Sequence, residues 1–283
     1  MIASRQKSSN SPPSRTAVEK EQKLRSLMRD MGRVLVAYSG GVDSSYLAYI
    51  AKSEIGERAV CVLGLSPSVS GEQQQVAEDF AKQFDLNIRT IETNELSDPN
   101  YTANPSNRCY FCKSELYSQL ESVAAELGVD IVVDGANADD VSDYRPGRSA
   151  AAEHQVRSPL IEVGLTKNEI RELSSMHGLP TWDKPSSPCL SSRLAYGVPV
   201  TIERLSKVEQ AESFLRGLGF REFRVRVHGE LARIEIARGE MANAFSEDFA
   251  DRVVERFRQI GFKYVTLDLQ GFRSGAMNEI LNK

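Results

Sequence analysis

The chain is poor in histidine, tryptophan and cysteine, with three, one and four residues respectively among 283. Four cysteines are too few for a disulfide scaffold. No apolar run approaches the ~18 residues that a membrane helix needs, and no signal-peptide core follows Met1. Basic residues are not in excess either, because 35 Lys and Arg stand against 39 Asp and Glu. These absences predict a cytoplasmic protein with neither a membrane nor a nucleic acid as its partner.

What remains is an ordinary globular composition, with 41% hydrophobic and 26% charged residues. At roughly 150 residues per domain, the length suggests about two domains. Residues 1–16 are rich in Ser, Pro and Arg, so we expect a disordered tail there. We predict a first domain over residues 17–199 and a second over 200–283.

Short apolar runs alternate with helical periodicity in the first domain. Strand-like runs are expected at residues 33–38, 59–65, 86–91 and 130–135. Helices are expected at residues 17–31, 43–55, 71–84 and 109–127. Another helix starts at Thr166, where Glu169 completes a capping box. This alternation predicts an α/β fold with a doubly wound parallel sheet.

The second domain has a different order of elements. We expect a helix at 203–218, strands at 223–228 and 231–236, a helix at 246–261 and a strand at 263–268. This order predicts a smaller α+β domain on an antiparallel sheet. Residues 181–200 before it are rich in Pro and Ser and lack periodicity, which is typical of a linker or an active-site loop.

The string SGGVDSS, residues 39–45, joins the first predicted strand to a helix. Glycines let backbone N–H groups approach a phosphate, and a helix N-terminus adds partial positive charge. The Gly-Lys-[Ser/Thr] ending of a Walker A loop is missing, and so is the G-x-G-x-x-G spacing. The plain alternative is a tight turn in which Asp43 caps the helix. The strand–loop–helix context favours an anion site.

Three of the cysteines are candidates for chemistry. Cys109 and Cys112 open a predicted helix and share one face of it, and Cys189 lies in the Pro/Ser-rich segment. Cys61 sits in the apolar run AVCVLGL and is most simply a core residue. The three thiols suit a structural zinc ion, a redox disulfide or a [4Fe–4S] cluster with one open iron position. Their spacing alone leaves these alternatives open.

Charged and apolar residues alternate in the second domain. In FRVRVH, residues 223–228, Arg224 and Arg226 face away from the valines. The plain interpretation is a solvated sheet face with cross-strand Arg–Glu pairs. The functional interpretation is a receptor for a small anion, because guanidinium groups suit phosphate and carboxylate.

SGGVDSS resembles the PP-loop of the ATP-pyrophosphatases, which split ATP into AMP and pyrophosphate while they adenylate a substrate. This resemblance implies that the loop holds the pyrophosphate end of ATP with Mg²⁺. The residues it assigns to ATP are Ser39, Gly40, Gly41, Val42, Asp43, Ser44 and Ser45.

Further segments resemble one branch of that superfamily, the LarE family of ATP-dependent sulfur transferases. They are DYRPGR (143–148), SPLIEVGLTKNEIREL (158–173), GLPTWDKPSSPCLSSRLAYG (178–197), RVRVH (224–228) and LDLQGFRSG (267–275). Members of this family build the nickel-pincer nucleotide cofactor of lactate racemase. The resemblance implies adenylation of a carboxylate on pyridinium-3,5-dicarboxylate mononucleotide, followed by its conversion to a thiocarboxylate.

The same resemblance assigns roles to single residues. It implies that Cys189, Cys109 and Cys112 are catalytic, with sulfur from Cys189 itself or from sulfide on a [4Fe–4S] cluster that the three hold. The other implied assignments are Gly135 and Arg193 to the adenylate pocket, Arg224, Arg226 and Arg273 to the anionic nucleotide, and Glu212 and Glu235 to a divalent metal.

Other functions share the loop. A three-cysteine PP-loop tRNA thiolase is the main alternative, but the acidic composition and the nearly neutral second domain disfavour it. An ammonia-using synthetase would need no such cysteines, and a non-catalytic ATP-binding regulator is a third alternative. We also expect a homo-oligomer.

Overall fold

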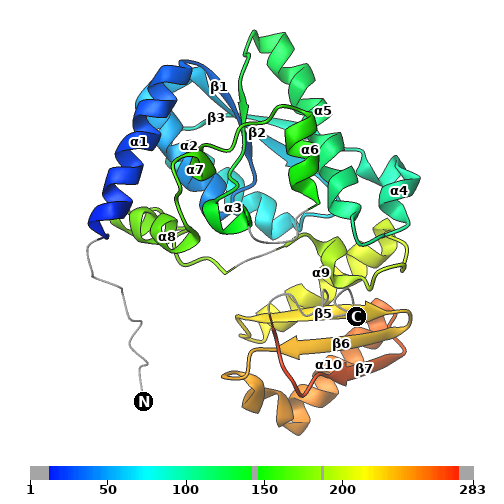
Figure 1. The fold of residues 1–283 in the computed structure, drawn as a ribbon. Coiled ribbons are helices and arrows are strands. Elements are labelled where there is room, and N and C mark those ends of the chain that lie inside the picture. Colours follow the sequence, from blue (N-terminus) through cyan, green and yellow to red (C-terminus); the bar gives the residue numbers. More distant parts are fainter. Residues whose placement is uncertain (1–12, 142–145, 186–187, 274–283) are drawn as a thin grey trace.

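The computed structural model describes residues 13–141, 146–185 and 188–273. Figure 1 shows a larger α/β domain above a smaller one that ends the chain. The elements of the larger domain, in chain order, are α1 (Arg15–Met31), β1 (Val34–Tyr38), α2 (Val42–Ile55), β2 (Ala59–Leu65), α3 (Gly71–Gln83), β3 (Asn87–Glu92), α4 (Pro99–Thr102), α5 (Arg108–Leu127), β4 (Val132–Val133), α6 (Gly147–Glu153), α7 (Pro159–Glu162) and α8 (Lys167–Met176). Short 3₁₀ turns lie between them at η1 (Gly56–Arg58), η2 (Glu95–Ser97) and η3 (Ala138–Val141).

The first sheet is entirely parallel, in the order β3-β2-β1-β4. Alternate residues of β1 are buried on opposite sides. Val34 and Val36 pack in one core with residues of α1, α2 and α8, and Leu35 packs in another with residues of α5 and α6. Helices therefore cover both faces of the sheet (Figure 1), and the α/β prediction is confirmed.

Strand order places the ligand-binding edge of this sheet. From β1 the chain adds β2 and then β3 on one side of the sheet, and it adds β4 on the other side of β1. The switch point in strand order therefore lies between β1 and β4. In such sheets ligands bind beyond the carboxyl ends of the strands at this switch point. The loop 39–45 follows β1, and Gly135 follows β4, so both lie at that edge.

Gly40 and Gly135 let neighbouring segments pack closely at this edge of the sheet. Gly40 has φ +66°, and a Cβ on it would lie 2.4 Å from the Cβ of Ala77 on α3. A Cβ on Gly135 would lie 2.8 Å from the backbone nitrogen of Ser44. The segment after β4 therefore packs directly on the start of α2, which only glycine permits.

The second domain contains α9 (Ile202–Gly217), β5 (Phe223–His228), β6 (Leu231–Ile236), α10 (Glu247–Ile260) and β7 (Tyr264–Leu267), with 3₁₀ turns at η4 (Leu190–Arg193) before it and η5 (Met241–Phe245) within it. β5 and β6 are antiparallel, but β6 and β7 are parallel. The expected antiparallel sheet is therefore wrong: the sheet is mixed. The crossover through α10 returns the chain to the end of the sheet where β6 began, so β7 runs alongside it.

Residues before α9 belong physically to the second domain. Leu190 and Leu194 are buried in the same core as the apolar residues of α9, β5 and β6. Leu194 also forms a parallel bridge with Val227 on β5. Residues 188–200, here called the Cys189 segment, therefore lie where the two domains meet.

Two elements have boundaries that differ from the expected ones by more than one residue. α1 begins at Arg15 with Ser14 as its cap, inside the expected tail, of which residues 1–12 are outside the described ranges. The strand expected at 130–135 is reduced to Val132 and Val133, because only these two pair with β1. The capping box of Thr166 and Glu169 is confirmed. Within the described ranges, no helix has the length and apolarity to cross a membrane.

Gly135→Ala tests the close approach at the switch point. We expect a loss of about 1–3 kcal/mol in the free energy of unfolding, because the added Cβ must displace the backbone of Ser44. Urea denaturation measures this. Gly217→Ala is the control, because its Cβ would meet nothing within 4 Å. Equal stabilities of the two variants would contradict the packing described.

Candidate active site

Residues 39–45 form the turn after β1 and the first residues of α2. The Ser39 backbone nitrogen donates to Ser44 Oγ at 3.2 Å, and the two serine hydroxyls lie 3.0 Å apart. Gly41 is the N-cap and supplies no side-chain cap. The first N–H groups of α2 therefore lack a capping side chain, which is the geometry of an anion site. A contact of these residues with ATP stays a prediction.

Two lysines reach this loop from distant parts of the chain. Lys167 Nζ lies 2.6 Å from Asp43 Oδ2, and Lys184 Nζ donates to the Gly40 carbonyl at 3.2 Å. The other carboxylate oxygen of Asp43, Oδ1, is buried and has no hydrogen-bond partner among the described residues. Sequence reasoning missed both lysines, because each lies more than 120 residues from its loop partner.

The cysteines divide as expected. Cys61 is completely buried in β2, and burial raises the pKa of its thiol to about 12. Cys109 is exposed, and Cys112 and Cys189 are partly exposed. Burial raises the pKa of Cys112 above its usual value, and the nearby Cys189, Glu95 and Cys109 raise it further. Cys112 packs against the core that contains Leu190, the residue after Cys189.

A buried hydroxyl cluster fixes the Cys189 segment to the first domain. The Tyr101 hydroxyl lies 2.6 Å from Ser191 Oγ and 2.7 Å from Ser68 Oγ, and the two serine hydroxyls are 3.0 Å apart. The backbone nitrogen of Leu190 donates to the Ser68 carbonyl at 2.7 Å. The residues next to Cys189 are therefore rigidly held on the α4 side.

The start of α5, which carries Cys109 and Cys112, is bound to the same segment. Asn104 donates to the carbonyls of Ala195 and Val198, both at 2.8 Å. Arg108 donates to Asn104 Oδ1 at 2.8 Å and stacks over the ring of Tyr196. These contacts bring the C-x-x-C pair toward Cys189 despite their separation in sequence.

Arg193 is the link between the Cys189 segment and the second domain. Its guanidinium forms two hydrogen bonds of 2.9 Å with the Glu212 carboxylate, and both residues are at most 5% exposed. Nη1 also donates to the carbonyls of Pro188 at 2.5 Å and Cys189 at 3.0 Å. The structure thus gives Arg193 a positioning role, and its contact with the adenylate stays a prediction.

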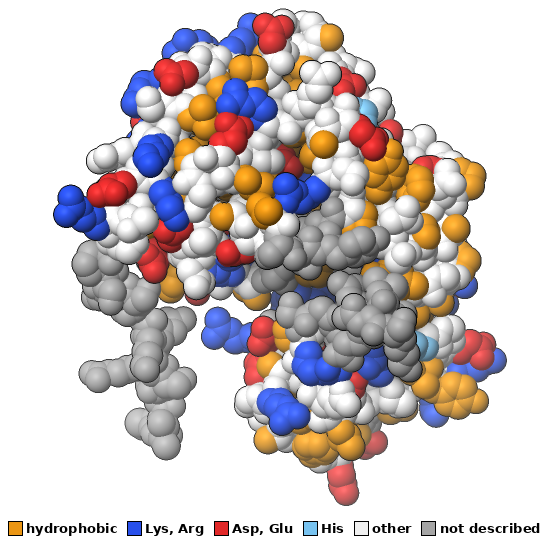
Figure 2. Space-filling view, viewed as in Figure 1, with side chains coloured by type: hydrophobic (Ala, Val, Ile, Leu, Met, Phe, Trp, Pro, Cys, Tyr) orange, Lys and Arg blue, Asp and Glu red, His pale blue; other side chains and the backbone are white. Residues whose placement is uncertain are grey.

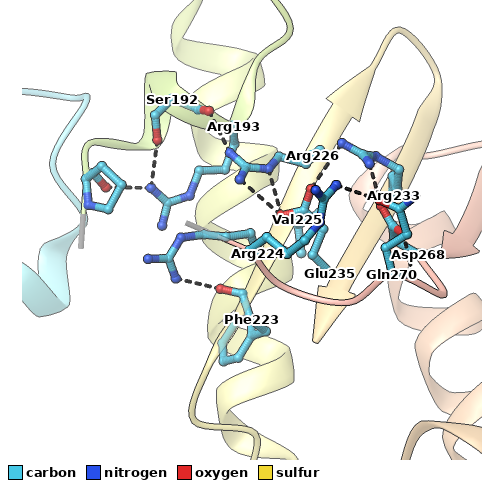
Figure 3. A network of polar contacts seen from close by, with 12 residues as sticks. Ser192, Arg193, Phe223, Arg224, Val225, Arg226, Arg233, Glu235, Asp268 and Gln270 are labelled. Carbon is cyan, nitrogen blue, oxygen red and sulfur yellow. Dashed lines mark hydrogen bonds and ion pairs between the residues drawn. The ribbon is translucent and has the colours of Figure 1, made fainter. Parts of the chain in front are cut away.

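A second chain of ion pairs joins Arg226 on β5 to Glu235 and Arg233 on β6 (Figure 3). Arg226 pairs with Glu235 at 3.0 Å, Glu235 pairs with Arg233 at 3.0 Å, and Arg226 donates to the Ser192 carbonyl at 2.9 Å. Arg226 and Glu235 are buried, with 6% and 1% of their surface exposed. The expectation of a solvated face is therefore wrong here, because the Cys189 segment covers it.

Arg224 and Arg273 lie at the margin of this network. Arg224 donates to the Phe223 carbonyl at 2.6 Å and stacks on the ring of Phe272. Burial, followed by the positive charges of Arg193 and Arg226, lowers the pKa of Arg224 to about 10. A bound anion would relieve this crowding of positive charge. Arg273 is exposed and donates to Gln270 at 2.6 Å.

The residues expected to hold metals do not form a prepared site. Within the described ranges, no group of three His, Cys, Asp or Glu side chains has the arrangement to hold a metal ion. Glu212 and Glu235 are each engaged by arginines, which leaves them poor metal ligands. The three thiols have the right chemistry for iron, but they do not form such a group in the described ranges.

Glu212→Ala tests the buried ion pair. We expect a loss of about 3–5 kcal/mol in the free energy of unfolding, because Arg193 would keep its charge in the interior without a counter-ion. Glu230→Ala is the control, since its pair with Lys263 is more than half exposed and is worth at most about 1 kcal/mol. Similar losses in urea denaturation would show that the buried pair contributes no more than a surface pair.

Thiol alkylation tests the placement of the cysteines. At pH 8 we expect iodoacetamide to modify Cys109 well before Cys61, because burial leaves Cys61 almost entirely protonated. Peptide mass spectrometry over time measures both rates. The unfolded chain in urea is the control, where the two should react alike. Early modification of Cys61 in the folded protein would overturn the assignment.

Comparison with known proteins agrees with this geometry. The NAD synthase family model matches residues 18–108, which include the glycine loop. GMP synthase of Clostridium acetobutylicum is 31% identical over 221 residues, which are 71% of this chain and 42% of that protein. These two matches cover part of this chain rather than its whole length.

Other relatives match nearly the full length. An uncharacterized protein of Synechocystis, slr1717, is 46% identical over 93% of this chain and 98% of its own. The pyridinium-3,5-bisthiocarboxylic acid mononucleotide synthase of Lactiplantibacillus plantarum is 37% identical over 95% of this chain and 97% of its own. The chain therefore belongs to the LarE family of PP-loop enzymes, the family of that synthase.

Proposed function

We propose that this enzyme activates a carboxylate of pyridinium-3,5-dicarboxylate mononucleotide with ATP and replaces the activated oxygen with sulfur. The observation that carries the proposal is the 37% identity, across 95% of the chain, to a synthase named for the bisthiocarboxylic acid product. The product would serve as the precursor of the nickel-pincer cofactor. The reaction belongs in the cytoplasm, in a homo-oligomer.

Adenylation takes place at the loop 39–45. A carboxylate oxygen attacks the α-phosphorus of ATP, the bond to the β-phosphate breaks, and pyrophosphate leaves with the electron pair. The N–H groups at the start of α2 stabilise the negative charge. Asp43 is the residue that would hold Mg²⁺, because its Oδ1 is buried without a partner and carboxylate oxygens suit this ion. Bound Mg²⁺ would neutralise the phosphates.

Sulfur transfer takes place at the Cys189 segment. The Cys189 thiolate attacks the acyl carbon and AMP leaves, which forms a thioester. Loss of the Cys189 α-proton to a base and cleavage of its Cβ–Sγ bond then release the thiocarboxylate and leave dehydroalanine. Cys109 and Cys112 are the residues that would hold a [4Fe–4S] cluster together with Cys189, and a bound cluster would supply sulfide in place of the Cys189 sulfur.

The second domain would bind the nucleotide. Arg224 and Arg226 lie on β5 and Arg273 follows β7, and the positive charges of Arg193 and Arg226 act on Arg224. Their guanidinium groups suit the phosphate and carboxylates of the substrate. On the face shown in Figure 2, basic and acidic side chains of the described residues are interspersed.

An anaerobic reaction with ATP, Mg²⁺ and the dicarboxylate mononucleotide tests the proposal. We expect AMP, pyrophosphate and a product in which one oxygen is replaced by sulfur. In Cys189→Ser we expect AMP release and thiocarboxylate to be lost while pyrophosphate exchange into ATP persists. Cys61→Ala is the matched control and should retain product formation.

The mass and the iron content of the protein identify the source of sulfur. A mass lowered by one H₂S at Cys189 after a single turnover indicates that the protein is consumed. Iron and labile sulfide in anaerobically purified protein, with repeated turnover, indicate a cluster instead. No nucleotide-dependent pyrophosphate exchange, together with submicromolar binding of tRNA in a gel shift, would refute the proposal in favour of a tRNA thiolase.

A further inference from the structure

Lys184 is a half-buried cation at the glycine loop whose charge has no direct counter-ion. Its ammonium donates to the carbonyl of Gly40 at 3.2 Å. It forms no ion pair with a carboxylate of the described residues. Burial lowers the pKa of this ammonium, and the Glu72 carboxylate opposes that effect only in part. A desolvated positive charge of this kind is stabilised by an anion.

The other lysines of the described ranges differ from it. Those that are partly buried all pair with a carboxylate: Lys20 with Glu169, Lys52 with Glu57, Lys113 with Asp134, Lys167 with Asp43 and Lys207 with Glu203. Lys23 and Lys82 have no such partner but are exposed. Lys184 alone in these ranges combines partial burial with the lack of an ion pair.

The backbone at Lys184 is held in place from α8. Arg171 donates from one terminal nitrogen to the Trp182 carbonyl at 2.6 Å and from the other to the Lys184 carbonyl at 2.7 Å. The Lys184 nitrogen donates to the Thr181 carbonyl at 3.1 Å. Because the main chain is fixed, the side chain is directed to Gly40 by the fold.

We propose that Lys184 binds the β- and γ-phosphates of ATP and stabilises pyrophosphate as it leaves. Gly40 lies inside the loop whose N–H groups form the anion site, so an ammonium on its carbonyl is adjacent to that site. Lys167 is less suited to this role, because Asp43 already neutralises its charge at 2.6 Å. This assignment rests on the proposed adenylation site, but not on the identity of the carboxylate substrate.

The proposed role of Lys184 follows from where negative charge develops during adenylation. When the carboxylate oxygen bonds to the α-phosphorus, the electron pair of the breaking bond moves to the β-phosphate oxygen. Negative charge on the leaving pyrophosphate therefore rises, and an ammonium beside it gains interaction energy in the transition state. No proton transfer or further reactant is needed.

Lys184→Gln tests the assignment through pyrophosphate itself. Isothermal titration of the full-length protein with Mg-pyrophosphate, without nucleotide substrate, measures the affinity directly. We expect a loss of about tenfold or more, because the variant lacks a charge-assisted hydrogen bond. Lys184→Arg keeps the charge and should lose less. Lys82→Gln is the control, because it removes the same charge from an exposed site and should bind as the wild type does.

The outcomes separate this assignment from the proposed function. Weaker pyrophosphate binding in Lys184→Gln, with an unchanged melting temperature and partial recovery in Lys184→Arg, supports it even if the pyridinium nucleotide is not the substrate. Wild-type affinity in Lys184→Gln overturns it, whatever the substrate. If Lys184→Gln fails to fold, Lys184→Arg provides the test. A pyrophosphate affinity lowered no more than in Lys82→Gln supports the role of the charge. Loss of pyrophosphate binding in a folded Lys184→Arg variant refutes it.

Discussion

Arg193 and Glu212 form the buried ion pair that holds the Cys189 segment against the second domain. The guanidinium satisfies the carboxylate with two hydrogen bonds and also binds the carbonyls of Pro188 and Cys189. A buried charge is tolerated only when it is paired in this way, so the position of Cys189 depends on a carboxylate of α9. Anything that moves α9 would therefore move Cys189.

The parallel sheet supplies the other half of the site. Its strand order brings the glycine loop and Gly135 to one edge, and the packing of Gly135 on Ser44 leaves no room for a side chain. The Cys189 segment lies between this edge and the polar face of β5 and β6. It is held by Ser68 on one side and by Arg226, through Ser192, on the other. An activated acyl group and a sulfur donor can meet at such a junction.

Local patterns predicted much of this arrangement from the sequence. Apolar runs and the Thr166 capping box predicted the strands and helices of the first domain, because these elements depend on residues that are close in sequence. The parallel pairing of β7 escaped prediction, since strand direction is set by a crossover and not by composition. The burial of Arg226 and the approach of Lys184 to a loop 144 residues away also escaped it, because both depend on contacts that only the folded chain makes.

We propose that a carboxylate activated at the loop 39–45 is presented to Cys189. A crystal structure with a non-hydrolysable acyl-adenylate analogue of the pyridinium nucleotide tests it most directly. We predict the phosphate mimic on the N–H groups at the start of α2, the pyridinium ring beside Arg224, and the acyl carbon within about 3.5 Å of the Cys189 Sγ. An acyl group directed away from the three cysteines would contradict this proposal.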